Sequence, residues 1–90
     1  MAHALNYTVV IEAKAQKEAL RIPIPQRSKI DKAILALATD PRPHASKKLA
    51  TQDGYRIRVG DYRVLYVVDD EAKTVVIYRI KIKGKRTYKQ

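Results

Sequence analysis

The sequence predicts an α+β domain in which two helices pack on one face of a mainly antiparallel, four-stranded sheet, in the order β-α-α-β-β-β. Three observations indicate this class: a β-branched run near the start of the chain, two consecutive helical patterns interrupted by prolines, and alternating apolar and charged residues in the second half. Ninety residues are enough for one small domain, residues 1–90, and too few for a second core.

The first strand and the first helix follow from residue type. Residues 6–11 contain the run Tyr-Thr-Val-Val-Ile, whose aromatic and β-branched side chains favour a strand. Ala, Lys, Gln and Glu dominate from residue 12 to about residue 21, and all four are good helix formers. The sequence Ile-Pro-Ile-Pro at residues 22–25 is expected to end this helix.

A second helix is predicted to begin at Pro25, because proline suits the first helical turn. Its apolar residues recur every three or four positions and are expected to face the core: Ile30, Ala33, Ile34, Leu37 and Ala38. Prolines at positions 41 and 43 stop the helix. Residues 44–48 are expected to form an extended basic linker.

Two β-hairpins are predicted to follow. Residues 55–59 alternate between apolar and cationic side chains, as in a strand with one buried face. Gly60 and Asp61 form a two-residue loop of the kind that joins antiparallel strands, and residues 62–68 form the next strand. After a polar turn at residues 69–73, residues 74–83 form the fourth strand and residues 84–90 a short basic tail.

The Gly-Asp loop determines which side chains share a face of the first hairpin. Residue 59 lies opposite residue 62 and residue 58 opposite residue 63, and opposite residues point to the same side. Arg56, Arg58 and Arg63 are therefore predicted to share one face. The other face is expected to meet the helices: Tyr55, Ile57, Val59, Tyr62, Val64 and Tyr66.

The register of the second hairpin is predicted from the same alternation. A register that keeps Val76, Tyr78 and Ile80 on the apolar face would place Arg79 opposite Arg63. The arginine cluster would then extend over three strands.

The formal net charge is +10, and most of it lies in the second half of the chain. Residues 41–90 contain thirteen Lys or Arg against five Asp or Glu, so they carry +8 of the total. A charge of this size attracts nucleic-acid phosphates, an anionic membrane or an acidic protein. It is also compatible with a basic surface that only favours solubility.

The composition argues against several classes of site. The chain has no cysteine, so it can form neither a disulfide nor a thiolate metal site, and the histidines at positions 3 and 44 are too far apart to suggest zinc. No stretch approaches the roughly 20 apolar residues of a membrane span, and the first residues do not resemble a signal peptide. We therefore expect a cytoplasmic protein that uses no metal, cofactor or membrane.

The arginine face requires an explanation, because like charges on neighbouring strands destabilise a sheet and no acidic residue on those strands neutralises them. A guanidinium binds phosphate through two parallel hydrogen bonds and stabilises negative charge that develops at phosphorus. The tail adds lysines and Tyr88, whose ring can stack on a base. The pattern predicts a polyanion site, with RNA as the favoured ligand; the alternative is that the arginines only keep an open sheet face soluble.

Several stretches together resemble the signature of the RelE/ParE toxin superfamily, the toxic half of bacterial toxin–antitoxin pairs. They are Pro-Arg-Pro at residues 41–43, Lys-Leu at 48–49, and Gly-Tyr-Arg-Ile-Arg-Val-Gly-Asp-Tyr-Arg-Val-Leu-Tyr at 54–66. The resemblance extends over nearly the whole chain, and residues 55–64 are its most specific part.

The resemblance implies a ribosome-dependent endoribonuclease that cleaves messenger RNA in the ribosomal A site without a metal. In that family the ribose 2′-hydroxyl attacks the neighbouring phosphate, which gives a 2′,3′-cyclic phosphate and a 5′-hydroxyl end. The resemblance also implies a cognate antitoxin as protein partner, often acidic in its toxin-binding part.

Carried over to this sequence, the resemblance assigns Arg63 to the transition state. It also implies catalytic roles for Arg56 and Arg58, which match basic positions of the preceding strand. Tyr88 matches a tyrosine that stacks on the base and orients the attack. Two further residues are candidates for the last basic catalytic position: Lys83 and Arg86. The remaining cations are expected to contact RNA: Lys47, Lys48, Arg79, Lys81 and Lys85.

The identity of the general base is left open, because arginine at both 56 and 58 leaves no group on that strand suited to accept a proton near neutral pH. Either a lysine of the tail or Tyr88 serves, or catalysis rests on charge stabilisation and on positioning by the ribosome. His44 is a conceivable acid–base group, but it lies in the linker beside Pro43. Two other functions share the fold: a ParE-like inhibitor of DNA gyrase and a non-catalytic RNA-binding module.

Overall fold

The computed structural model describes residues 6–82, which form two helices and five strands in the order β1-α1-α2-β2-β3-β4-β5. The helices are α1 (Ala13–Leu20) and α2 (Ile24–Ala36). The strands are β1 (Thr8–Ile11), β2 (Ser46–Lys48), β3 (Tyr55–Val59), β4 (Tyr62–Asp69) and β5 (Thr74–Ile82). They form one sheet in the spatial order β1-β5-β4-β3-β2, in which β1 runs parallel to β5 and the other pairs are antiparallel.

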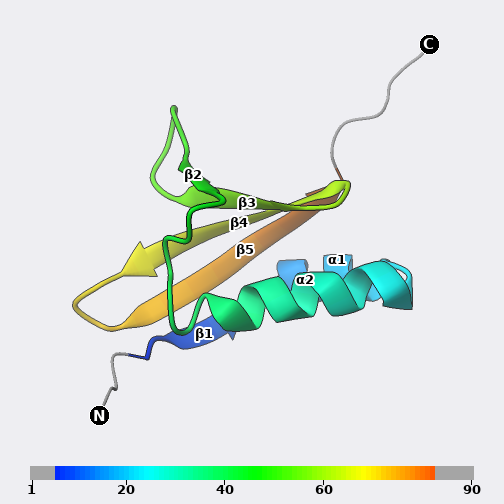
Figure 1. Ribbon diagram of the computed structural model, residues 1–90, viewed down its shortest axis with the longest axis horizontal. Helices are drawn as coiled ribbons and strands as arrows, with labels where there is room; N and C mark the ends of the chain where they lie inside the picture. The colour runs from blue at the N-terminus through cyan, green and yellow to red at the C-terminus, as the bar shows by residue number, and fades with distance from the viewer. Residues whose placement is uncertain (1–5, 83–90) are drawn as a thin grey trace.

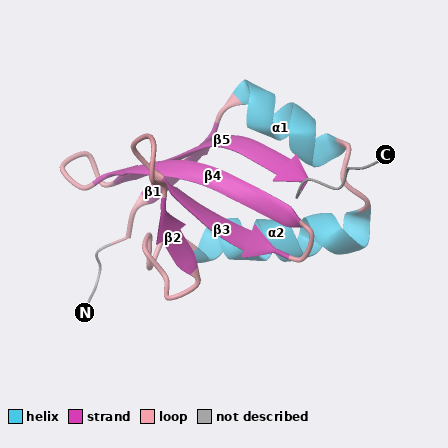
Figure 2. Ribbon diagram, turned by 90° about the horizontal axis from the view of Figure 1, so that it is seen from above, coloured by secondary structure: helices cyan, strands magenta, loops and turns pink. Residues whose placement is uncertain are grey.

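Both helices lie on the same side of the sheet, as Figure 1 shows, and Figure 2 gives the view onto the opposite side. Within residues 6–82 no helix covers that opposite side. The predicted α+β class and the helical pair on a mainly antiparallel sheet are therefore confirmed.

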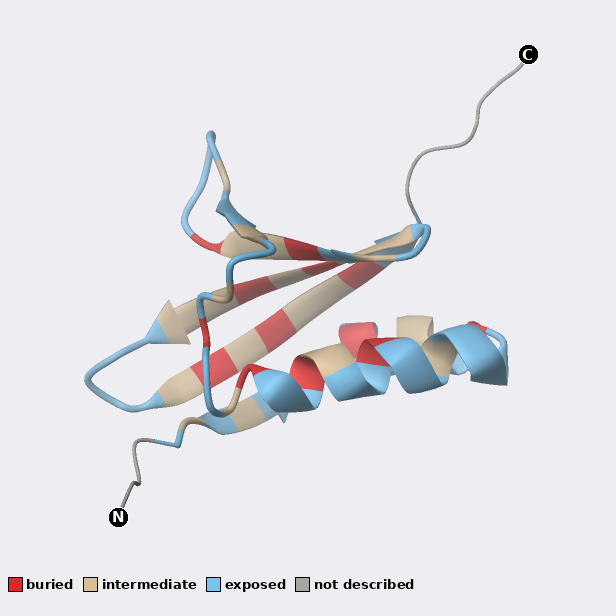
Figure 3. Ribbon diagram, viewed as in Figure 1, coloured by how far each residue is buried: buried red, intermediate tan, exposed pale blue. Residues whose placement is uncertain are grey.

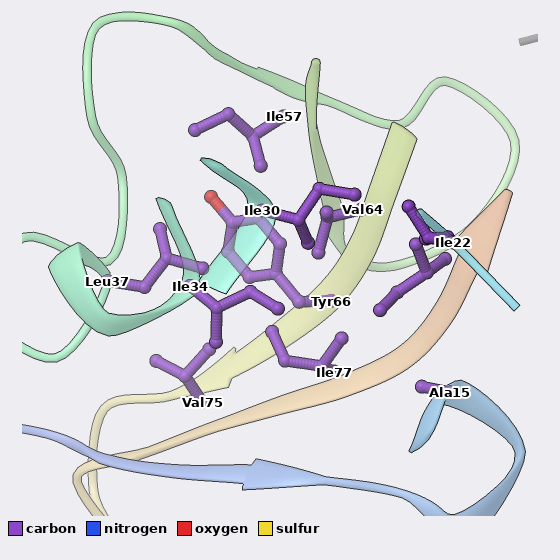
Figure 4. Packing of buried hydrophobic residues seen from close by; sticks show 11 residues of the cluster. Ala15, Ile22, Ile30, Ile34, Leu37, Ile57, Val64, Tyr66, Val75 and Ile77 are labelled. Atoms are coloured by element: carbon purple, nitrogen blue, oxygen red, sulfur yellow. The ribbon is translucent and has the colours of Figure 1, made fainter. Parts of the chain in front are cut away.

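The core lies between the helices and the sheet. Buried segments alternate with partly exposed ones along the strands in Figure 3, as expected for a sheet with one covered face. Tyr66 is fully buried, and its ring lies among Ile30, Ile34 and Ile77 in Figure 4. The other buried apolar residues come from α1, the α1–α2 connection, the turn after α2 and three strands: Ala15, Ile22, Leu37, Ile57, Val64, Val75 and Ile80.

The prediction of an extended linker at residues 44–48 is wrong in part, because Ser46–Lys48 form a strand, β2. The sheet therefore has five strands where four were predicted. The segment pairs with β3 at the edge of the sheet and is only three residues long. Its Ser-Lys-Lys sequence has low strand propensity, and short edge strands that carry lysine are a common way to prevent pairing between molecules. The pairing with β3, rather than local propensity, therefore accounts for this strand.

The predicted register of the second hairpin is also wrong, because β5 contains one extra residue. Leu65 lies opposite Arg79 whereas Tyr66 lies opposite Ile77, so Tyr78 is the additional residue of a β-bulge. A bulge reverses the alternation of all residues beyond it. Val75 and Ile77 are therefore buried in place of Val76 and Tyr78, while Ile80 is buried as predicted.

Candidate nucleic-acid interface

The β3–β4 hairpin has the predicted register. Gly60 adopts a φ of +59°, the left-handed conformation that a two-residue hairpin loop favours and glycine adopts readily. Val59 lies opposite Tyr62, and Arg58 lies opposite Arg63. Arg56, Arg58 and Arg63 therefore share the side of the sheet that faces away from the helices.

Two rows of opposite residues cross the strands on that side. The first row runs Lys47, Arg56, Leu65 and Arg79 over β2 to β5. The second row runs Arg58, Arg63 and Lys81 over β3 to β5. We call five of these cations the cationic face: Lys47, Arg56, Arg58, Arg63 and Lys81.

The structure corrects the neighbour of Arg63 in β5: it is Lys81, and the predicted Arg79 lies one row away, opposite Leu65. The bulge at Tyr78 accounts for one residue of this two-residue shift, and the register near the β4–β5 turn, where Tyr66 lies opposite Ile77, accounts for the other. Lys47 lies opposite Arg56 and joins the cationic face, whereas Lys48 lies opposite Tyr55 and has the other parity. Of the two lysines expected to contact RNA at this edge, only Lys47 therefore shares a side with the arginines.

The charge of the cationic face is not compensated by the part of the chain that the structure describes. The two ion pairs found within residues 6–82 involve other cations, Arg42 and Arg79. Arg63 Nε is buried and has no hydrogen-bond partner among the described residues. Buried polar atoms normally have such a partner, so Arg63 Nε is an exception among the described side chains.

Arg79, expected to contact RNA, is bound within the protein. Its Nε donates to Glu18 Oε2 of α1 at 2.9 Å, and the Ile80 backbone N–H donates to Oε1 of the same carboxylate at 2.7 Å. The side chains of Arg79 and Glu18 are only 32% and 21% exposed. Sequence patterns give no signal for this contact, because Glu18 looks like any charged residue of a surface helix.

A second cluster lies at the opposite end of the strands from Gly60. Arg42 donates to both oxygens of Asp70, at 3.2 and 2.8 Å, and its Nε donates to the Tyr55 hydroxyl at 2.9 Å. The Tyr7 hydroxyl also donates to Asp70, at 2.6 Å. These contacts join the residue before β1, the segment after α2, the start of β3 and the β4–β5 turn, and they neutralise Arg42 within the protein.

The cluster shifts the ionisation of its members. Hydrogen bonds from Arg42 and then Tyr7 lower the pKa of Asp70 from 3.8 to about 2. The hydrogen bond to the Asp70 carboxylate raises the pKa of Tyr7, with burial as a smaller cause. The hydrogen bond to Asp70 is likewise the largest cause that raises the pKa of Arg42.

We expect Asp70 to make stability depend on pH in the acid range. Its pKa is lower in the folded state than in the unfolded state, so its contribution is present above about pH 4 and is lost as the pH falls towards about 2. The free energy of unfolding should be measured in urea at several pH values between about 2 and 4. We expect the unsubstituted protein and Asp70→Asn to differ near pH 4 and to agree near pH 2. Asp31→Asn, an exposed substitution in α2, is the matched control, and a difference for Asp70→Asn that did not vary over this range would contradict the assignment.

Other candidate residues are placed as follows. Four predicted site residues lie outside residues 6–82: Lys83, Lys85, Arg86 and Tyr88. His44 is exposed in the turn before β2. Residues 6–82 hold no cluster of three or more potential metal-ligating side chains, and none of their helices has the length and apolar character needed to cross a bilayer.

Comparison with known proteins identifies the protein family of this chain. Residues 9–86 match the family model of the ParE toxin of type II toxin–antitoxin systems. A search of curated proteins found no match.

Solved structures of toxin–antitoxin complexes are similar over most of the chain. A chain of the RelBE2 complex from Mycobacterium tuberculosis is 30% identical with a TM-score of 0.76, over 86% of this chain and 98% of that one. A chain of the archaeal RelE–RelB complex from Pyrococcus horikoshii is 26% identical with a TM-score of 0.77, over 90% and 99%. A chain of the intact RelBE complex of E. coli is 27% identical with a TM-score of 0.76, over 89% and 99%. The protein therefore belongs to the ParE toxin family, within the RelE/ParE superfamily of type II toxin–antitoxin toxins.

Proposed function

We propose that this toxin is an endoribonuclease that cleaves messenger RNA in the ribosomal A site. The observation that carries the proposal is the row Arg58, Arg63 and Lys81, three neighbouring cations that take part in neither ion pair of the described residues. Three neighbouring cations on an open sheet face form a suitable site for a phosphate group of RNA. The similarity to RelE-type structures supports the same activity.

In the proposed reaction the ribose 2′-oxygen forms a bond to the adjacent phosphorus, and the bond from phosphorus to the 5′-oxygen of the next nucleotide breaks. Negative charge increases on the phosphoryl oxygens in the transition state, where Arg63 and its neighbour Arg58 stabilise it. The 2′-hydroxyl loses a proton to a base, and the leaving 5′-oxygen gains one. The products are a 2′,3′-cyclic phosphate and a 5′-hydroxyl, and no metal takes part.

Proton transfer is assigned to lysine or tyrosine, because the described cationic face carries no carboxylate or imidazole. Lys81 is the lysine opposite Arg63. Lys83, Arg86 and Tyr88 remain proposed catalytic residues from the resemblance, with Tyr88 stacking on the base. Arg56, Lys47 and Lys85 are proposed to hold the RNA backbone. Lys48 has the other parity, and Arg79 would have to leave Glu18 to do so.

The proposed partner in the cell is a cognate antitoxin. Several similar structures are toxin–antitoxin complexes, and a net charge of +10 suits a partner with an acidic binding segment. We propose that a small adjacent reading frame encodes it. High yields of the toxin from growing cells that lack this frame would contradict the proposal.

Mapping of RNA ends after induction tests the nuclease function. We expect growth arrest and codon-phased cuts that end in 2′,3′-cyclic phosphate when the chain is expressed alone, and neither when the neighbouring gene is co-expressed. Inhibition of DNA gyrase is the second candidate, favoured by the match to the ParE toxin family model. Intact messages together with loss of gyrase supercoiling activity would support gyrase inhibition, and intact messages without growth arrest would support a non-catalytic module.

A further inference from the structure

The orientation of Lys81 depends on the β-bulge in β5. Before the bulge, Ile77 lies opposite Tyr66; after it, Arg79 lies opposite Leu65 and Lys81 opposite Arg63. If the same sequence paired without a bulge, the register of Ile77 and Tyr66 would continue along both strands and place Ile80 opposite Arg63. Lys81 would then point to the helical side, so the third cation of the row exists only because of the bulge.

A bulge interrupts the hydrogen-bond ladder and needs support from its surroundings. On the outer edge of β5 the neighbouring strand β1 ends at Ile11, and Glu12 N–H makes a last bond to the Ile77 carbonyl. Beyond that point β1 no longer pairs with β5, and the side chain of Glu18 in α1 accepts a backbone hydrogen bond that a neighbouring strand would otherwise accept. Its carboxylate accepts the Ile80 backbone N–H at 2.7 Å and the Arg79 guanidinium at 2.9 Å, directly after the bulge.

We propose that Glu18 is a positioning residue: by holding Arg79 and the Ile80 amide it fixes the bulged register that places Lys81 beside Arg63. The two hydrogen bonds are charge-assisted and half-buried, and hydrogen bonds of this type are stronger than neutral ones. They act on backbone and side chain of consecutive residues, so they oppose a one-residue slip of β5. The catalytic consequence rests on the proposed nuclease function, whereas the structural consequence does not.

An engineered disulfide tests the register directly. The chain has no cysteine, so Arg63→Cys with Lys81→Cys introduces a single thiol pair. Opposite residues of antiparallel strands have Cα atoms about 4.5–5.5 Å apart, within the range that a disulfide requires. We expect this disulfide to form readily with Glu18 present, and its equilibrium constant against glutathione to fall about tenfold or more in Glu18→Ala.

Two controls make the result specific. Glu71→Gln removes an exposed negative charge in the β4–β5 turn and should leave the disulfide unchanged. A second pair, Arg58→Cys with Arg63→Cys, reports on β3–β4 and should not respond to Glu18→Ala. A loss of both disulfides in Glu18→Ala would indicate general unfolding. In that case Glu18→Gln, which keeps an acceptor for the Ile80 amide, is measured in the same assay, and a weaker 63–81 disulfide with an unchanged 58–63 disulfide would support the inference. An unchanged 63–81 disulfide in both Glu18 variants would overturn the inference.

Catalysis provides the second readout, in protein without the engineered cysteines. We expect Glu18→Ala to lower kcat for RNA cleavage about tenfold with little change in KM, because the RNA-binding arginines remain in place while Lys81 is displaced. Glu18→Gln, which keeps an acceptor for the Ile80 amide, should lower kcat less. Equal loss of kcat for Glu71→Gln would contradict the assignment. Absence of cleavage by the unsubstituted protein would refute the nuclease function and leave the disulfide result to decide the role of Glu18.

Discussion

Replacing Arg63 by alanine is expected to abolish growth arrest and to lower the rate of RNA cleavage by about a hundred- to a thousandfold, the usual effect of removing one preorganised donor to developing negative charge. Arg63 is the middle residue of its row, between Arg58 and Lys81. No neighbour can replace it without a change in register. RNA ends should be quantified after induction, and the same variant should be assayed on ribosomes.

The matched control is Arg27→Ala, which removes an arginine from α2 on the other side of the sheet. Arg63→Lys should have intermediate activity, because lysine keeps the charge but lacks the planar fork. Thermal unfolding should show little loss of stability in Arg63→Ala, since the substitution also relieves repulsion from Arg58. Full toxicity of a folded Arg63→Ala would remove Arg63 from the mechanism.

Tyr66→Ala is expected to lower the free energy of unfolding by about 4 kcal/mol, as is typical when a buried aromatic side chain is removed. Tyr66 is fully buried and stacks on Tyr55, with ring centroids 5.9 Å apart. Its hydroxyl donates to the Pro41 carbonyl at 2.9 Å, and burial raises its pKa. The residue therefore joins the core to the segment that leads from α2 to β2.

Tyr66→Phe separates the ring from the hydroxyl. We expect a loss of about 1 kcal/mol, because the ring remains but the Pro41 carbonyl loses a donor. Urea unfolding of the two variants, with exposed Leu35→Ala as a control in α2, measures both effects. Equal losses for Ala and Phe would mean that the hydrogen bond, and not packing, makes the main contribution.

The β3–β4 hairpin is predictable because its information is local. The alternation of Ile57 with Arg56 and Arg58, together with Gly60 in the loop, determines both register and face. The shared side of Arg56, Arg58 and Arg63 therefore follows correctly from residue order alone. The two helices are similarly predictable from residue type and prolines, with α2 beginning one residue earlier than expected, at Ile24.

The remaining parts of the site depend on contacts distant in sequence. β2 has a poor strand sequence and forms because β3 offers a free edge. The bulge at Tyr78 has no glycine or proline to mark it, and its support comes from Glu18, far earlier in the chain. Alternation places both Arg79 and Lys81 on the side of Arg63 but does not determine which of them lies opposite it, and that residue is Lys81.

The pairing of β1 with β5 has a consequence for when the protein becomes active. Thr8 lies opposite Thr74, so β1 pairs with a strand that is synthesised much later in the chain. Closing so long a segment carries an entropic cost, and it cannot begin before β5 has emerged from the exit tunnel. A nascent chain consequently lacks both a complete sheet and the third cation of the row, Lys81, so the proposed site cannot form before residues 74–82 are free to pair.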